Sequence, residues 1–173
     1  DSLADGKGVG PLIDALTPAN RPKPTAQEIE FINQMIMTRN DPKALAIAER
    51  AAKWVIDNRA LPDGGFRHGE KDRGGPFLGD TLAMGQAFLD LYAATGNRDW
   101  LTSAAKAGDF VATFRDEAGG FVTSKTAEGK TGVLAKPAKP IDDQVQVARF
   151  MNLLNRYFGN ENYREQAAHA MRY

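Results

Sequence analysis

The sequence predicts an all-α fold of three antiparallel α-hairpins. Apolar residues recur at helical spacing over long segments, and glycine, proline, asparagine and aspartate separate these segments. The motif Gly-Gly-Phe occurs twice, at residues 64–66 and 119–121, each time after a helix-patterned segment. The segments before the two motifs also align with a shift of one residue, so that Leu45 and Trp54 fall opposite Leu101 and Phe110. A repeat of helical pairs is typical of stacked hairpins, in which each unit buries its apolar face against its neighbours.

Composition excludes several classes of function. The 173 residues are 42% hydrophobic and 25% charged, which is enough for one globular core. The 22 basic and 22 acidic side chains cancel, so we expect no nucleic-acid partner. With no cysteine and only two distant histidines, we predict no metal and no cofactor. No apolar run could span a bilayer, and the chain begins with Asp, so we expect a soluble protein, cytoplasmic or exported after removal of a signal.

The first quarter of the chain divides into an arm and two helices. Residues 1–24 are rich in glycine and proline and are predicted to form an arm or linker, while residues 25–173 form the helical-hairpin domain. Thr25 and Glu28 have capping-box spacing, which predicts a helix over 26–38. Asp41-Pro42 is the next start signal, and the helix that follows should end near Asn58.

The middle of the chain predicts a second hairpin. Residues 67–79 are polar and glycine-rich and should form a loop, after which Asp80 is predicted to cap a helix that stops at Gly96. Asn97 begins the partner helix at once, so the two helices should be antiparallel neighbours. Small residues on the partner, including Gly108, would let two helix axes approach closely.

The last part of the chain repeats this order. After a loop over 123–140, Asp142 or Asp143 is predicted to cap a helix that ends at Phe158. Gly159-Asn160 then repeats the Gly96-Asn97 turn, and Tyr163 stands where Trp100 stood, which predicts a packing role for both aromatic residues. Short extended pieces are expected only near 65–68 and 120–123, after the glycines of each motif.

Three stretches carry a family resemblance. They are Pro76-Phe77-Leu78-Gly79-Asp80-Thr81-Leu82-Ala83, the segment 91–101 from Leu-Tyr through Thr-Gly to Trp-Leu, and Gly119-Gly120-Phe121. Together these stretches resemble the (α/α)6-toroid families grouped as six-hairpin glycosidases. Within that group, residues 41–173 resemble the C-terminal helical region of uncharacterised proteins that begin with a thioredoxin-like domain. The resemblance implies part of an α/α toroid, with three hairpins of six and with functional residues in the loops on one face. Nothing in the chain resembles the thioredoxin-like domain, so its redox chemistry is not carried over.

Asp80 and Asp143 are the candidate catalytic residues, with Asp142 beside the second of them as a candidate for substrate binding. The repeat puts Asp80 and Asp143 at equivalent places, so two carboxylates should face one rim. Glycoside chemistry needs one protonated acid and one base or nucleophile, roughly 5 to 10 Å apart. The alternative is that each aspartate only caps its helix.

Four residues around the Gly-Gly-Phe motifs are further candidates for substrate binding. Arg67 can clamp a carboxylate and His68 titrates near neutrality, although an exposed hairpin can carry both without function. Phe66 and Phe121 could stack on sugar faces or could instead plug the core. The second histidine, His169, is expected to be solvated.

Two functions remain open. The first is a non-catalytic or degenerate helical-repeat module that binds a saccharide or a protein partner, and the second is a carbohydrate-active enzyme such as a glycoside hydrolase or a sugar epimerase. The helix over 143–158 carries more large apolar groups than one stripe can bury, so we also expect it to contact another copy, further hairpins of a longer chain, or the arm. The groups concerned are Val147, Phe150, Met151, Leu154, Tyr157 and Phe158.

Overall fold

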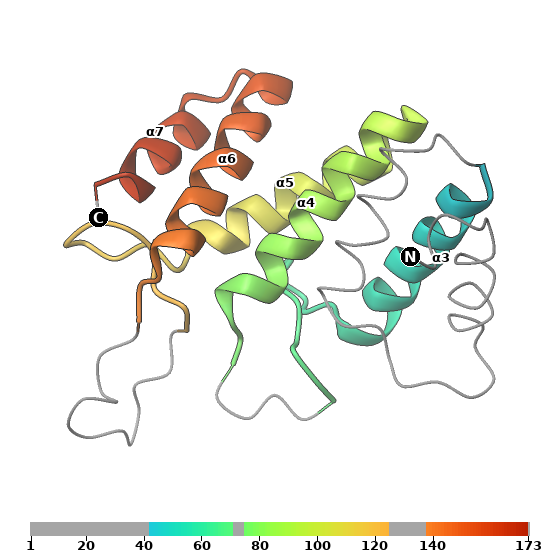
Figure 1. Cartoon of the computed structure of the whole chain (residues 1–173), viewed down its shortest axis with the longest axis horizontal. Helices are drawn as coiled ribbons and strands as arrows, with labels where there is room; N and C mark the ends of the chain where they lie inside the picture. The colour runs from blue at the N-terminus through green and yellow to red at the C-terminus, as the bar shows by residue number, and fades with distance from the viewer. Residues whose placement is uncertain (1–41, 71–74, 125–137, 173) are drawn as a thin grey trace, which may run out of the picture.

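A computed structural model describes residues 42–70, 75–124 and 138–172 (Figure 1). These residues form five α-helices, namely α3 (Pro42–Arg59), α4 (Leu78–Thr95), α5 (Arg98–Ala112), α6 (Ile141–Phe158) and α7 (Glu161–Ala170). Within the described ranges extended backbone is limited to isolated bridges, so the predicted all-α fold is confirmed. The expected arm over 1–24 and the expected helix over 26–38 lie outside the described residues. None of the five helices has the length and apolar character needed to cross a membrane.

Two of the predicted hairpins are present, α4 with α5 and α6 with α7. Gly96 ends α4 in the left-handed conformation (φ 68°), and Asn97 then caps α5 by accepting a hydrogen bond from the amide of Asp99 at 2.9 Å. Gly159 (φ 63°) and Asn160 repeat the arrangement between α6 and α7. The Gly-Asn pair therefore ends one helix and caps the next in both turns, as predicted.

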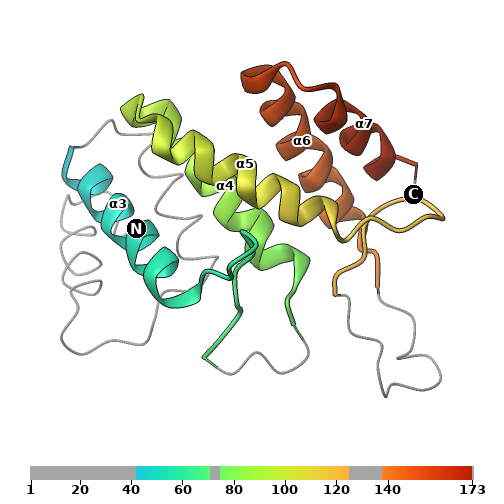
Figure 2. The same ribbon diagram turned by 180° about the vertical axis from the view of Figure 1, so that it is seen from behind.

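The helices alternate in direction along the chain. In Figures 1 and 2, α4 and α6 begin at one edge of the molecule, and the described residues directly before them, 75–77 and 138–140, lie at that same edge. Helix α3 packs on α4, and α6 packs on both members of the α4–α5 hairpin. We call the edge formed by the first turns of α4 and α6, together with residues 66–68, the N-terminal edge.

Aromatic rings and glycines join the helices in the core. Trp100 is buried and stacks on Phe88, with ring centroids 5.8 Å apart, so its predicted packing role is confirmed. Tyr163 is also buried, and its hydroxyl lies 3.1 Å from Asp109 Oδ1. Burial and the nearby Asp109 carboxylate raise the pKa of Tyr163 to about 12. The predicted close approach at Gly108 is present, because a Cβ there would lie 2.4 Å from Leu154 Cδ1.

The two Gly-Gly-Phe turns (residues 64–66 and 119–121) share a bridge and the conformation of their first glycine, and they differ at the second, where Gly120 but not Gly65 has a positive φ. Phe66 pairs with Ala60 and Phe121 with Arg115 in antiparallel bridges, which confirms the predicted short extended pieces. The first glycine of each turn has a positive φ, 95° at Gly64 and 112° at Gly119. A side chain would be strained at both positions.

Each turn rests on the helix pair that follows it. A Cβ at Gly64 would lie 2.8 Å from the carbonyl oxygen of Lys106 in α5, and a Cβ at Gly119 would lie 2.8 Å from that of Arg172, just after α7. These approaches are between backbone atoms, so both glycines are needed for space as well as for conformation.

Helix α6 differs from the prediction in which side chains it exposes. Four of its six expected outward candidates are fully buried, and only Tyr157 and Phe158 are exposed. The buried set is Val147, Phe150, Met151 and Leu154. Phe150 is buried because its ring fills the space over Gly85, where a Cβ would come within 2.4 Å of Phe150 Cζ. The buried apolar stripe of α6 is thus wider than packing on a single helix would require, because α6 packs on both α4 and α5.

Candidate functional site

The two candidate aspartates do not cap their helices, so the predicted capping role is wrong. Helix α4 begins at Leu78 after Phe77, helix α6 begins at Ile141 after Pro140, and neither start has a side-chain capping bond. For α4 the reason is tertiary, since the amide of Leu78 already donates to the carbonyl of Thr123 at 2.9 Å in the neighbouring loop. Asp80 and Asp143 lie in the first turns instead.

Asp80 holds His68 by direct contact. Nδ1 of His68 lies 3.0 Å from Asp80 Oδ1 and 3.2 Å from Oδ2, so Nδ1–H donates to the carboxylate. The edge of the imidazole also meets Phe77, with ring centroids 5.9 Å apart. The side chain of Asp80 is only 15% exposed, whereas that of His68 is 73% exposed. A sheltered carboxylate therefore orients an exposed imidazole at the N-terminal edge.

Arg67 turns away from this pair toward the end of α3. Its Nη2 donates to the carbonyl of Asn58 at 2.8 Å, and its backbone amide donates to the carbonyl of Arg59 at 2.9 Å. A cation at a helix C-terminus is favourable, so the contact has a structural explanation. Nε of Arg67 is buried with no hydrogen-bond partner among the residues described.

Asp143 has a different environment from Asp80. It is half-buried in the first turn of α6 beside the exposed Asp142. Burial, and secondly the negative charge of Asp142, raise the pKa of Asp143 above its usual range. A raised carboxyl pKa is the direction of shift that a general acid requires.

Phe66 and Phe121 are buried, at 5% and 0% exposure, which favours their interpretation as core plugs. Their backbone amides donate hydrogen bonds to side chains of α4 and α6 at equivalent positions. The amide of Phe66 donates to Thr81 Oγ1 at 3.0 Å, and that of Phe121 donates to Gln144 Oε1 at 2.7 Å. Sequence reasoning missed Thr81 and Gln144, although each directly follows one of the repeated aspartates.

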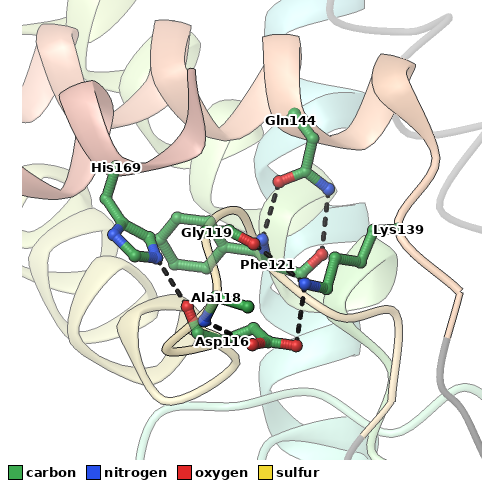
Figure 3. A network of polar contacts seen from close by, with 7 residues as sticks. All are labelled: Asp116, Ala118, Gly119, Phe121, Lys139, Gln144 and His169. Atoms are coloured by element: carbon green, nitrogen blue, oxygen red, sulfur yellow. Dashed lines mark hydrogen bonds and ion pairs between the residues drawn. The ribbon is translucent and has the colours of Figure 1, made fainter. Parts of the chain in front are cut away.

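The second turn is also surrounded by a polar network (Figure 3). Lys139 Nζ donates to Asp116 Oδ2 at 2.8 Å and to the carbonyl of Gly119 at 2.9 Å. The hydrogen bond from Lys139, followed by that from the amide of Ala118, lowers the pKa of Asp116 below its usual range. His169 is buried at 4% exposure, and its Nε2 donates to the carbonyl of Asp116 at 2.8 Å, so the expectation of a solvated histidine is wrong. The burial arises because the turn docks on the end of α7, a contact that the local sequence does not contain.

The N-terminal edge thus brings together some of the candidates. His68 contacts Asp80, and Asp142 and Asp143 stand at the start of the next parallel helix along the same edge (Figures 1 and 2). In the described ranges no three histidine, aspartate or glutamate side chains gather in a way that could hold a metal ion.

Comparison with known proteins supports the fold. No protein-family model matches the chain, and no curated protein matches it. Among solved structures it resembles cellobiose 2-epimerase from Spirochaeta thermophila, with a TM-score of 0.62, 21% identity and coverage of 84% of this chain and 40% of that one. It also resembles a family 76 glycoside hydrolase, an α-mannanase from Bacteroides thetaiotaomicron, with a TM-score of 0.66, 16% identity and coverage of 84% and 41%. The chain has the fold of part of an (α/α)6 toroid.

A second family 76 hydrolase from Bacteroides thetaiotaomicron, a mannosidase, gives the same result, with a TM-score of 0.65, 16% identity and coverage of 83% and 40%. At these identities the likeness shows the fold alone. The chain spans about 40% of the length of these structures, so their activities come to it only as proposals. The relation to thioredoxin-domain proteins stays a prediction.

Proposed function

We propose that this chain is a carbohydrate-related toroid module that binds a saccharide at its N-terminal edge without transforming it. The contact between His68 and Asp80 carries the proposal. It holds a hydrogen-bonding imidazole in one orientation at the surface, and the carboxylate that holds it comes from a rigid helix. Pre-oriented polar groups lower the entropy cost of binding a ligand rich in hydroxyl groups.

The chemistry of the edge suits a sugar better than an anion or an apolar ligand. Carboxylates accept hydrogen bonds from hydroxyl groups, and an imidazole can donate or accept one. Asp80, Asp142 and Asp143 would repel phosphates and other polyanions. The solved structures of the same fold are named as enzymes of cellobiose and mannose-containing sugars, which agrees with a saccharide ligand.

Titration with saccharides tests the proposal. We expect cellobiose or manno-oligosaccharides to shift amide signals of residues 66–68 and the first turn of α4 in NMR spectra. Asp80→Asn should weaken binding by about tenfold, because the loss of one charged hydrogen-bond acceptor costs about 1.4 kcal/mol. Asp99→Asn is the matched control, since Asp99 is an exposed first-turn aspartate of α5 at the other end of the hairpin. Equal affinity of the wild-type and Asp80→Asn proteins, or no binding of any sugar, would contradict the proposal.

The second candidate, a carbohydrate-active enzyme, is favoured by the raised pKa of Asp143. Asp143 as acid and His68 as base would form the acid–base pair that sugar hydrolysis or epimerisation needs. Incubation with cellobiose and mannan in D2O, followed by NMR, separates the two candidates. The binding module leaves both sugars unchanged, whereas product formation or deuterium incorporation that Asp143→Asn abolishes would establish the enzyme.

A further inference from the structure

Helix α6 has an outward side that the described helices leave exposed, apart from a contact of Tyr92 in α4 with Tyr157 at its end. Every exposed large hydrophobic residue in the described part of the chain lies on α6 or directly after α7, with exposures from 39% to 61%. They are Ile141, Val145, Leu153, Tyr157, Phe158 and Met171. An apolar group of this kind, confined to one hairpin, usually marks an interface. We define the outer α6 face as Ile141, Asp142, Val145, Gln146, Arg149, Asn152, Leu153, Arg156 and Tyr157.

The outer α6 face matches itself when it is read in the opposite direction. With Arg149 as the centre, Val145 falls opposite Leu153, and Ile141 falls opposite Tyr157. The same register sets Asp142 opposite Arg156 and Gln146 opposite Asn152. Two antiparallel copies of this helix would therefore pair apolar with apolar, acid with base and amide with amide, as a two-fold symmetric interface requires.

The surface of α6 is hollowed where such a partner would enter. A cavity of about 330 Å³ is lined by Leu153, Arg156 and Tyr157. These three residues fall opposite Val145, Asp142 and Ile141 of a second copy in the register above. Tyr157 is also held in place by an edge-to-face contact with Tyr92, at 5.3 Å between ring centroids.

We propose that two copies of this chain associate through antiparallel packing of their outer α6 faces. Side chains of Ile141 and Val145 from the second copy fill the hollow, and Asp142 of the second copy pairs with Arg156. The exposed ion pairs set the register more than the affinity. The two Arg149 side chains meet near the axis and repel each other, and one helix pair gives a small interface, so the dimer should be weak, with a Kd of about 10 to 100 µM.

Charge reversal tests the register directly. Sedimentation equilibrium and light scattering on the 173-residue chain, from about 5 to 500 µM, should show a reversible monomer–dimer equilibrium. Arg156→Asp and Asp142→Arg should each raise the Kd at least tenfold, because each places like charges together twice in the symmetric interface. The double variant should return the Kd to within about threefold of the wild-type value. Arg98→Glu, which makes the same charge change on the exposed start of α5, should leave the Kd unchanged.

A further variant tests the centre of the interface. Arg149→Ala removes the repulsion between the two central arginines and should lower the Kd of the dimer. This variant also tests the register if circular dichroism shows that a charge-reversed variant does not fold. A monomer at every concentration would overturn the proposal and would favour a hairpin of another polypeptide as the cover of this face. A dimer whose Kd is unchanged by the charge reversals, or a Kd that rises in Arg149→Ala, would also overturn the proposal.

Discussion

Asp80 and Asp143 show how two equivalent residues of a repeat acquire different chemistry. Asp80 has an imidazole within 3.0 Å, whereas Asp143 has a neighbouring carboxylate and partial burial. The first environment provides a hydrogen-bond donor for the carboxylate, and the second favours the neutral acid. Two sequence differences contribute: the second turn is followed by Val122 and Thr123 where the first has Arg67 and His68, and Asp142 precedes Asp143 where Gly79 precedes Asp80.

Asp143→Asn should change the pH dependence of stability. Because the native chain holds the Asp143 proton more tightly than the unfolded chain, this residue makes the free energy of unfolding fall as the pH rises from the ordinary pKa of 3.8 through the raised native pKa. The Asn variant lacks this decline. Urea unfolding from about pH 4 to pH 7 should therefore show a difference between variant and wild type that grows in favour of the variant as the pH rises.

Asp142→Asn is the companion variant for this measurement. It removes the like charge and should reduce the decline without abolishing it, because burial is the larger cause of the raised pKa. Parallel stability curves for wild type and Asp143→Asn would show that Asp143 titrates normally.

The sequence predicted which residues meet at the N-terminal edge better than it predicted what they do there. A short loop joins His68 to Asp80, so their proximity followed from the chain itself. The capping roles were wrong because the start of α4 is set by hydrogen bonding to residue 123, which comes from the next loop. Burial of His169 was also missed, since it depends on docking between segments more than 50 positions apart in the chain.

At the scale of the element, one side chain of the following helix, α4 or α6, binds the backbone of the phenylalanine in each Gly-Gly-Phe turn. Gln144 binds the second turn with two bonds, accepting from the amide of Phe121 and donating to its carbonyl, and it also donates to the carbonyl of Pro140 at the start of α6. Thr81 holds the first turn through the single bond to the amide of Phe66. The side chain of Gln144 is fully buried, so its bonds have no competition from water.

Gln144→Ala should lower the free energy of unfolding by about 1 to 3 kcal/mol, because it leaves the buried amide of Phe121 without an acceptor. The amide of Phe121 should also exchange with solvent faster in native-state hydrogen exchange. Gln146→Ala, an exposed change two positions along the same helix, should stay within about 0.5 kcal/mol of wild type. Equal effects of the two substitutions would show that the side chain of Gln144 does not hold the turn.

At the scale of the whole molecule, the two hairpins interlock through glycines. Phe150 and Leu154 of α6 enter the spaces over Gly85 in α4 and Gly108 in α5. Within the described residues, the type and order of the elements were predictable from periodicity and from the Gly-Asn turns. Which apolar side chains of α6 face inward was not predictable, because the helix periodicity cannot show that α6 meets two partners at once.

Gly85→Ala and Gly79→Ala should have opposite effects on stability, although both lie in α4. A Cβ at residue 85 would come within 2.4 Å of the buried Phe150 ring, and the strain of about 1 to 3 kcal/mol should outweigh a helix-propensity gain of up to about 1 kcal/mol. At residue 79 nothing lies within 4 Å, so only the gain remains. Urea unfolding compares them, and a stabilised Gly85→Ala would mean that the hairpins can move apart without cost.

The backbone contacts of Gly64 and Gly119 bear on how such a repeat can evolve. The first glycine of each turn meets the next helix pair through main-chain atoms, so this contact requires glycine on one side and places no demand on side-chain identity on the other. The second glycine of the first turn differs, because a Cβ at Gly65 would lie 2.4 Å from the ring of Phe110. After duplication of a hairpin, most other helix positions could therefore diverge while the junction stayed intact. This predicts that whole hairpins can be exchanged between such chains if these glycines and the ring of Phe110 are kept.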